Sequence, residues 1–64
     1  MTLYRHYKGG VYELVIIANH SETQEKMVVY KNVDNGKVWV RPFEMFFEKV
    51  LVGGTEVPRF EQMK

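Results

Sequence analysis

Short apolar or alternating stretches, separated by glycine and polar turns, make up the chain as far as residue 41. They predict four strands, over residues 3–8, 11–20, 26–32 and 37–41. Gly9-Gly10 and Asn35-Gly36 suit tight hairpins, and Asn35-Gly36 is typical of a type I′ turn with two positive φ angles. The polar residues 21–25 predict a longer loop. This part of the chain therefore predicts an antiparallel meander.

After Pro42 the hydrophobic period lengthens. Phe43, Phe46, Phe47 and Val50 fall at i, i+3, i+4 and i+7, which predicts the apolar stripe of a helix with Pro42 at its first position. A helix of two turns does not hold alone, so it must pack on the sheet, and a 3₁₀ turn is the alternative.

Residues 50–52 and 56–60 flank Gly53-Gly54 and predict a closing hairpin, in which Pro58 marks an edge. Residues 61–64 are predicted to be a frayed tail. The total is five or six strands and one short helical turn. We therefore predict an all-β domain over residues 4–60, either a small SH3-like barrel or a strongly curled antiparallel sheet.

Trp39 is the only tryptophan and thus the largest apolar side chain available for burial. We expect it to be largely buried beside the phenylalanines of the helical turn. Arg41 lies on the same side of the predicted strand, because strand side chains alternate. The alternative is that Trp39 is the wall of a pocket in which Arg41 holds a carboxylate or a phosphate.

Composition narrows the possible functions of these 64 residues. Without cysteine, disulfides and thiolate metal sites are excluded. Nine Lys and Arg face eight Asp and Glu, which argues against a dedicated nucleic-acid binder. The longest apolar run, residues 14–18, is far below the roughly 20 residues that span a bilayer. No signal-peptide pattern opens the chain, so we expect a cytoplasmic protein with no membrane contact.

An ordered set of short motifs runs over residues 4–60. The motifs are Tyr4-Arg5-His6-Tyr7-Lys8-Gly9, His20-Ser21-Glu22-Thr23, Val28-Val29-Tyr30, Trp39-Val40-Arg41-Pro42, Met45-Phe46 and Pro58-Arg59-Phe60. This ordered set resembles a small bacterial family known as domain of unknown function 1653. The chain departs from the family at residues 33–36, where relatives tend to carry leucine, tyrosine and glycine. The resemblance implies a bacterial module, stand-alone or appended, with no assigned activity.

Catalytic arrangements are weak in this sequence. His20 and Ser21 are adjacent, so they point to opposite faces of a strand and do not form a nucleophile and base. His6, His20 and Glu22 suit zinc by type, but their spacing matches no known signature. A small metal-dependent hydrolase, or an accessory domain of one, therefore stays an alternative that requires these three to converge. We predict no catalytic residue, metal or cofactor.

Binding is the function that the pattern favours. Basic and aromatic residues alternate along the chain, and the candidate ligand-binding residues are Tyr4, Arg5, His6, His20, Trp39, Arg41 and Arg59. We predict a non-catalytic binding module for a protein, a peptide or a small anionic ligand. Single-stranded nucleic acid is the alternative that stacking aromatics beside cations would serve. We expect the strands over 3–8 and 37–41 to form one polar-aromatic surface. We also expect the edge of the first strand to be the place for a second chain, either by strand addition or through a two-fold contact in a homodimer.

Overall fold

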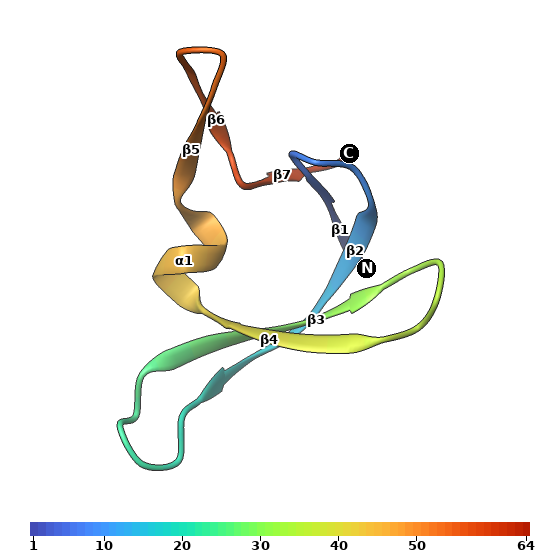
Figure 1. The fold of residues 1–64 in the computed structure, drawn as a ribbon. Coiled ribbons are helices and arrows are strands. Elements are labelled where there is room, and N and C mark those ends of the chain that lie inside the picture. The colour runs from blue at the N-terminus through green and yellow to red at the C-terminus, as the bar shows by residue number, and fades with distance from the viewer.

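The computed structural model describes residues 1–64 and contains seven strands and one short helix (Figure 1). The elements are β1 (Thr2–His6), β2 (Val11–Asn19), β3 (Lys26–Asn32), β4 (Val38–Pro42), α1 (Phe43–Phe47), β5 (Lys49–Val52), β6 (Thr55–Pro58) and β7 (Phe60–Gln62). α1 is the only helix, and it is too short to cross a membrane.

Five of the strands form one antiparallel sheet in the order β4-β3-β2-β1-β7, and β5 and β6 form a separate hairpin. The sheet curls, and α1 and the hairpin lie between its two ends (Figure 1). Because β4 and β7 do not pair, the sheet is not closed into a barrel. The predicted all-β class with one helical turn is confirmed, in its curled-sheet form.

The C-terminal residues belong to the sheet. Phe60–Gln62 pairs with β1, with Glu61 opposite Arg5 and Gln62 opposite Tyr4. The Met63 N–H then donates to the carbonyl oxygen of Leu3 at 2.8 Å. The expected frayed tail is therefore a seventh strand as far as Gln62, because the chain crosses to a new neighbour after Pro58 instead of ending in the hairpin.

This pairing also corrects the predicted dimer edge. β1 pairs with β2 on one side and with β7 on the other, so it has no free edge for a second chain. The free edges of the sheet are those of β4 and β7.

A bulge explains the apolar run of residues 14–18. Leu14 lies opposite the buried Tyr30, and the register then shifts between Leu14 and Ile16. As a result Ile17 lies opposite the buried Val28, although it is three residues beyond Leu14. The extra residue keeps Leu14 and Ile17 on the same face on both sides of the bend, but only Leu14 packs against the core, and Ile17 is 40% exposed.

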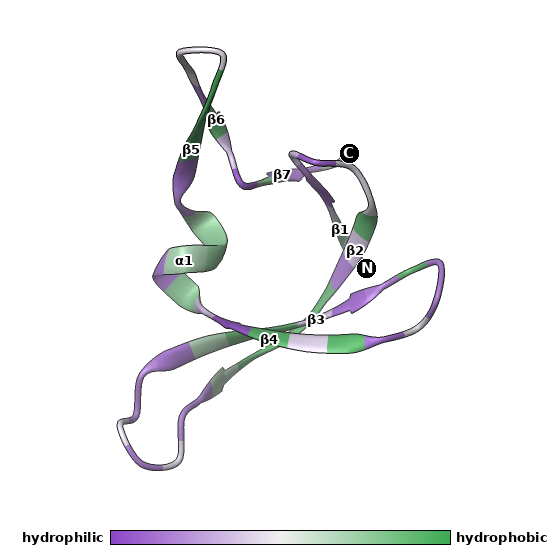
Figure 2. Cartoon of the chain, in the orientation of Figure 1, coloured by the Kyte–Doolittle hydropathy of each residue, from purple (hydrophilic) through white to green (hydrophobic).

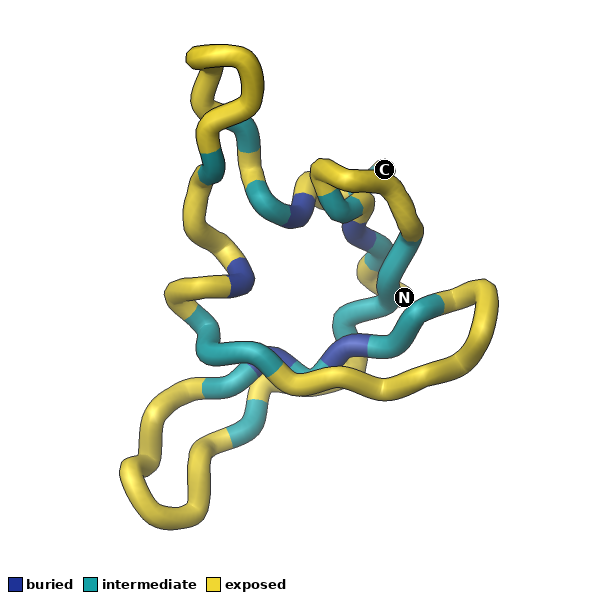
Figure 3. Tube along the Cα trace, viewed as in Figure 1, coloured by how far each residue is buried: buried dark blue, intermediate teal, exposed yellow.

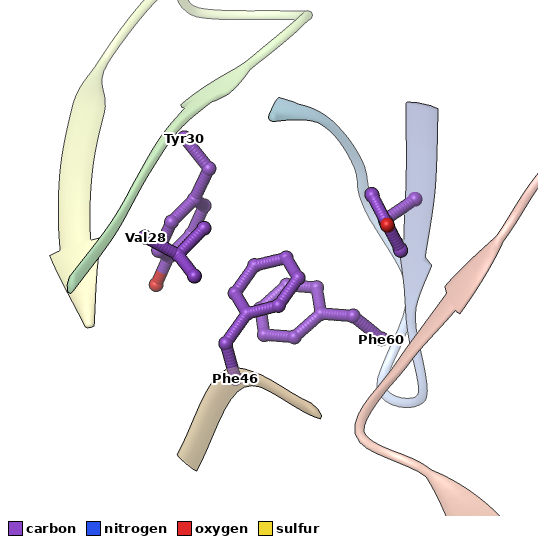
Figure 4. Close-up of a cluster of buried hydrophobic side chains, with 5 residues drawn as sticks. Val28, Tyr30, Phe46 and Phe60 are labelled. Atoms are coloured by element: carbon purple, nitrogen blue, oxygen red, sulfur yellow. The ribbon is translucent and has the colours of Figure 1, made fainter. Parts of the chain in front are cut away.

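The core lies on the inner face of the curled sheet and consists of Tyr4, Val28, Tyr30, Phe46 and Phe60 (Figures 3 and 4). Phe46 from α1 is fully buried and stacks on Phe60, with ring centroids 4.1 Å apart. Trp39 is 49% exposed, so its predicted burial beside the helix is wrong. α1 fills the space with Phe46, whereas Trp39 lies on the edge strand, opposite Tyr30.

Two local predictions also change. Pro42 is the last residue of β4, with ψ 140°, and precedes α1 rather than opening it. Val50 belongs to β5, because the backbone is already extended at Glu48. Figure 2 shows hydrophobic residues along β4, on α1 and on the β5–β6 hairpin.

The loop before β4 is longer than a two-residue hairpin. Only Gly36 has a positive φ there, at 73°. The Asn32 side-chain Oδ1 accepts the N–H groups of Asp34 and Asn35, and the Gly36 N–H donates to the Asn32 carbonyl. A four-residue loop, closed by the Asn32 side chain, therefore replaces the predicted type I′ turn.

Candidate ligand-binding site

A cavity of about 210 Å³ opens on the inner face of the sheet beside the free edge of β4. We call it the β4 pocket, and its lining residues are His6, Tyr12, Tyr30, Trp39, Arg41 and Phe60. Each of the five sheet strands contributes at least one of them. A cavity of this size is smaller than a typical pocket for a drug-sized ligand, so it fits one small group rather than a large cofactor.

The strand register explains why these residues meet. Trp39 and Arg41 are two apart on β4 and therefore share its inner face. Trp39 lies opposite Tyr30 on β3, and His6 on β1 lies opposite Phe60 on β7. Trp39 lies on β4 and Phe60 on β7, which are the two edge strands of the sheet. The pocket forms because the curl of the sheet brings these two edges toward each other.

Arg41 is the cation of the pocket. Its Nε donates to the hydroxyl oxygen of Tyr30 at 3.3 Å, and its guanidinium carbon lies 5.8 Å from the centre of the Phe60 ring. The two ion pairs of the chain are Lys31–Glu13 and Arg59–Glu48, so no carboxylate neutralises Arg41. The contacts to Tyr30 and Phe60 fix the guanidinium and leave its terminal N–H groups available for an anion.

His6 supplies a neutral ring beside this cation. Its Nδ1 accepts the Lys8 backbone N–H at 3.1 Å, so the proton of the neutral ring resides on Nε2. Burial lowers the pKa of His6 below its ordinary value of 6.5, and the positive charges of Arg41, Arg59 and Lys8 lower it further. At neutral pH His6 is therefore a hydrogen-bond donor through Nε2 without adding a positive charge.

The aromatic walls of the pocket are packed against each other. Tyr12 contacts Tyr30 and Phe60 edge to face, with ring centroids 5.5 and 5.6 Å apart. Tyr30 contacts Phe60 in the same way at 5.3 Å. Trp39 is the one aromatic residue of the pocket whose side chain is largely open to solvent. Trp39 is therefore the ring of the pocket that has surface left for a flat group to stack on.

A sequence comparison identifies the family. The model of the family described as Protein of unknown function (DUF1653) matches residues 2–62. The chain belongs to this family. No curated protein and no solved structure matches it. The resemblance that the motifs indicate is thus confirmed, over a slightly longer stretch than residues 4–60, and the family description assigns no activity.

In this DUF1653 domain the predicted site residues lie in several places. His6, Trp39 and Arg41 line the β4 pocket. Tyr4 is a core residue, and Arg5, its neighbour on β1, points to the other face. Arg59 forms an ion pair with Glu48, with Nη2 and Oε1 2.7 Å apart. The expected surface from both strands therefore contains His6 from the first strand but neither Tyr4 nor Arg5.

His20 lies far from the pocket in the loop between β2 and β3. Its Nδ1 accepts the backbone N–H groups of Glu22 and Thr23, at 3.1 and 3.3 Å, so its ring stabilises the turn. No three His, Asp or Glu side chains of this DUF1653 domain form a group that could hold a metal ion. The convergence of His6, His20 and Glu22 that the hydrolase alternative requires is absent.

Tyr12 lines the pocket, although it is not among the candidate residues predicted from the sequence. Its position at the start of β2, opposite Tyr4, depends on the Gly9-Gly10 hairpin register. The alternation of Tyr12 and Leu14 ahead of the apolar run is the signal that would place it on the inner face.

A second cavity of about 320 Å³ lies between β1, β7 and the β5–β6 hairpin. Arg5 and Glu61 are the charged residues of its lining, and His6 and Tyr7 add two further polar side chains. Glu61 lies opposite Arg5 in the β1–β7 register and lines the same cavity, although the two side chains form no ion pair. Arg41 differs from Arg5, because it lies opposite Val28 and no carboxylate lines its cavity.

Proposed function

We propose that the protein is a non-catalytic binding module whose β4 pocket takes a carboxylate attached to a flat or apolar group. The observation that carries this proposal is Arg41, held in place by Tyr30 and Phe60 with no acidic partner in the chain. The His6 Nε2–H is a second donor, and Trp39 is the stacking surface. A forked guanidinium with a neutral donor suits the two oxygens of a carboxylate.

Single-stranded nucleic acid fits this geometry less well. Successive bases stack on a row of open aromatic rings inside a basic groove. In the β4 pocket only Trp39 is open, because Tyr12, Tyr30 and Phe60 cover one another. One arginine and a net charge of +1 also give a weak attraction for a phosphate backbone.

Benzoate and benzamide form a matched pair of probes, since they share a ring and differ in charge. We expect benzoate to shift the NMR signals of the Trp39 indole, Arg41 and Tyr30 in ¹⁵N-labelled protein, with a Kd of about 1 mM as befits so small a ligand. Benzamide should bind at least about tenfold more weakly, because a hydrogen bond to a charged group contributes about 1.5–3 kcal/mol.

Two variants test whether the preference for benzoate over benzamide depends on Arg41. Arg41→Gln should abolish the preference for benzoate, whereas Arg5→Gln, which removes an arginine from the other face of the sheet, should keep it. Equal shifts with benzamide, or benzoate shifts that follow Arg5, would overturn the proposal. Tighter binding of a hexathymidine oligonucleotide than of benzoate at Trp39 would favour the nucleic-acid alternative instead.

A further inference from the structure

The free edge of β4 is unusually apolar for an exposed strand. Val38, Trp39 and Val40 are three consecutive residues with exposed fractions of 61%, 49% and 59%. β4 ends the sheet, so its outer side has no neighbouring strand. Exposed apolar edge strands are ready templates for another strand, and proteins normally protect them with charges or a covering segment.

The backbone of β4 shows which groups are free. The Asn32 N–H donates to the Lys37 carbonyl at 2.9 Å, which makes this pair a hydrogen-bonded one. Hydrogen-bonded and non-hydrogen-bonded pairs alternate along an antiparallel ladder. Trp39 and Arg41 are two and four residues beyond Lys37, so their backbone N–H and C=O groups also point to β3. The N–H and C=O groups of Val38 and Val40 therefore point to the open side of the edge.

The position of Pro42 agrees with this alternation of backbone directions along β4. It is two residues beyond Val40, so its missing N–H lies on the open side and costs no bond to β3. The proline lies at the end of β4 next to α1, and the free groups of Val38 and Val40 are left available.

The two faces of β4 offer different chemistry to an added strand. On the inner face, Trp39 and Arg41 line the β4 pocket. On the outer face, Val40 lies opposite Val29, and Val29 lies opposite Ile16, which is 58% exposed. A strand beside β4 would therefore meet an apolar row on one face and an unpaired arginine on the other.

We propose that β4 binds an extended segment of a partner protein as a sixth strand of the sheet, with an acidic side chain directed to Arg41. This inference rests on the proposed function, because the acidic side chain occupies the β4 pocket. Its alternate side chains are apolar and lie beside Val38 and Val40. Backbone bonds supply affinity, and the alternation of acidic and apolar side chains supplies selectivity.

Charge decides between this partner and a second copy of the chain. The segment 37–42 contains Lys37 and Arg41 and no acidic residue. Two copies joined through β4 would bring these like charges together and leave both arginines without a carboxylate, which is unfavourable. A partner segment with glutamate or aspartate at every second residue places carboxylates beside Arg41 on the inner face. The apolar residues between them lie beside Val38 and Val40 on the outer face.

The probe is the peptide acetyl-Val-Glu-Val-Glu-Val-amide. Every pair in the sheet is antiparallel, and in that orientation the peptide valines bond the free groups of Val38 and Val40. We expect the peptide to slow amide hydrogen exchange at Val38 and Val40 and to shift the Arg41 signals. Replacing both glutamates by glutamine should weaken binding at least about tenfold.

N-methylation of the peptide tests the backbone contact. A methyl on the central valine nitrogen blocks bonding to β4 and should weaken binding about tenfold. A methyl on the following glutamate nitrogen points away from β4 and is the matched control, with a smaller loss.

Benzoate binding without peptide binding would overturn the strand addition and leave the proposed function standing. Equal losses from the two methylated peptides would also overturn it. Protection of Val38 and Val40 without peptide, together with a dimer in sedimentation, would show that a second copy occupies the edge.

Discussion

Phe46, rather than the single tryptophan, is the side chain on which the stability of this domain depends most. Phe46 has no exposed surface and contacts four other aromatic rings, including Phe60 in a stacked arrangement at 4.1 Å. It reaches the core from α1, which is only five residues long and does not persist without packing. Phe46→Ala therefore removes both the centre of the core and the contact that holds the helix.

The expected loss follows from this environment. A buried phenylalanine truncated to alanine costs about 3–5 kcal/mol, since the transfer energy and the cavity add. A domain of 64 residues has a free energy of unfolding of about 3–10 kcal/mol at typical values per residue. Phe46→Ala should thus remove about a third or more of the free energy of unfolding. Trp39→Ala should cost about 1–2 kcal/mol, because half of that side chain is already exposed.

Urea denaturation followed by far-UV circular dichroism measures both variants, whereas tryptophan fluorescence would be lost in Trp39→Ala. Phe46→Leu is a milder variant that should remain folded, with a loss of about 1–3 kcal/mol. A loss of about 3 kcal/mol or more for Trp39→Ala would contradict the reasoning, because that is the cost of truncating a buried aromatic side chain.

Two further predictions concern a turn and a titrating group. Gly36→Ala should lower the free energy of unfolding by about 1–2 kcal/mol in urea denaturation, because φ is positive there while the space for a methyl is open. An unchanged midpoint would show that the loop adopts another conformation. The pKa of His6 is lowered by folding, so the unfolded chain binds more protons and stability falls as the pH drops below about 6.5. The urea midpoint should fall less between about pH 7.5 and about pH 5 in His6→Gln than in the parent. Equal pH profiles would refute this role of His6.

The strands themselves were predictable because their signals are local. The strand over residues 26–32 has the predicted bounds, and the Gly9-Gly10 and Gly53-Gly54 turns join antiparallel pairs as expected. Alternation and glycine act within a few residues, so they appear in any window of the sequence. The length of the helix was harder to predict, since Val50 satisfies both the helical stripe and a strand.

Strand order was not predictable by the same means. Phe60–Gln62 crosses to β1 over more than fifty residues of sequence, and this pairing converts β1 from an edge to an interior strand. It also delivers Phe60 to both the core and the β4 pocket. The sequence therefore indicated Arg41, Trp39 and His6 as candidates, whereas the composition of the pocket around them depends on a contact between the chain ends.

The stability of the isolated domain does not explain why half of Trp39 is exposed or why Arg41 has no carboxylate partner. The core is complete without Trp39, and Arg41 has no acidic partner in either ion pair of the chain. Polar β-branched residues at such an edge would protect it from association at little cost. Residues whose placement does not suit the stability of the isolated fold concentrate at functional sites, where another molecule provides the missing contact. Trp39 and Arg41 share one face of the only strand that combines a free edge with three exposed apolar residues. Selection for stability alone would thus place polar residues on β4. A ligand bound at β4 would instead add a strand to the sheet and a carboxylate beside Arg41.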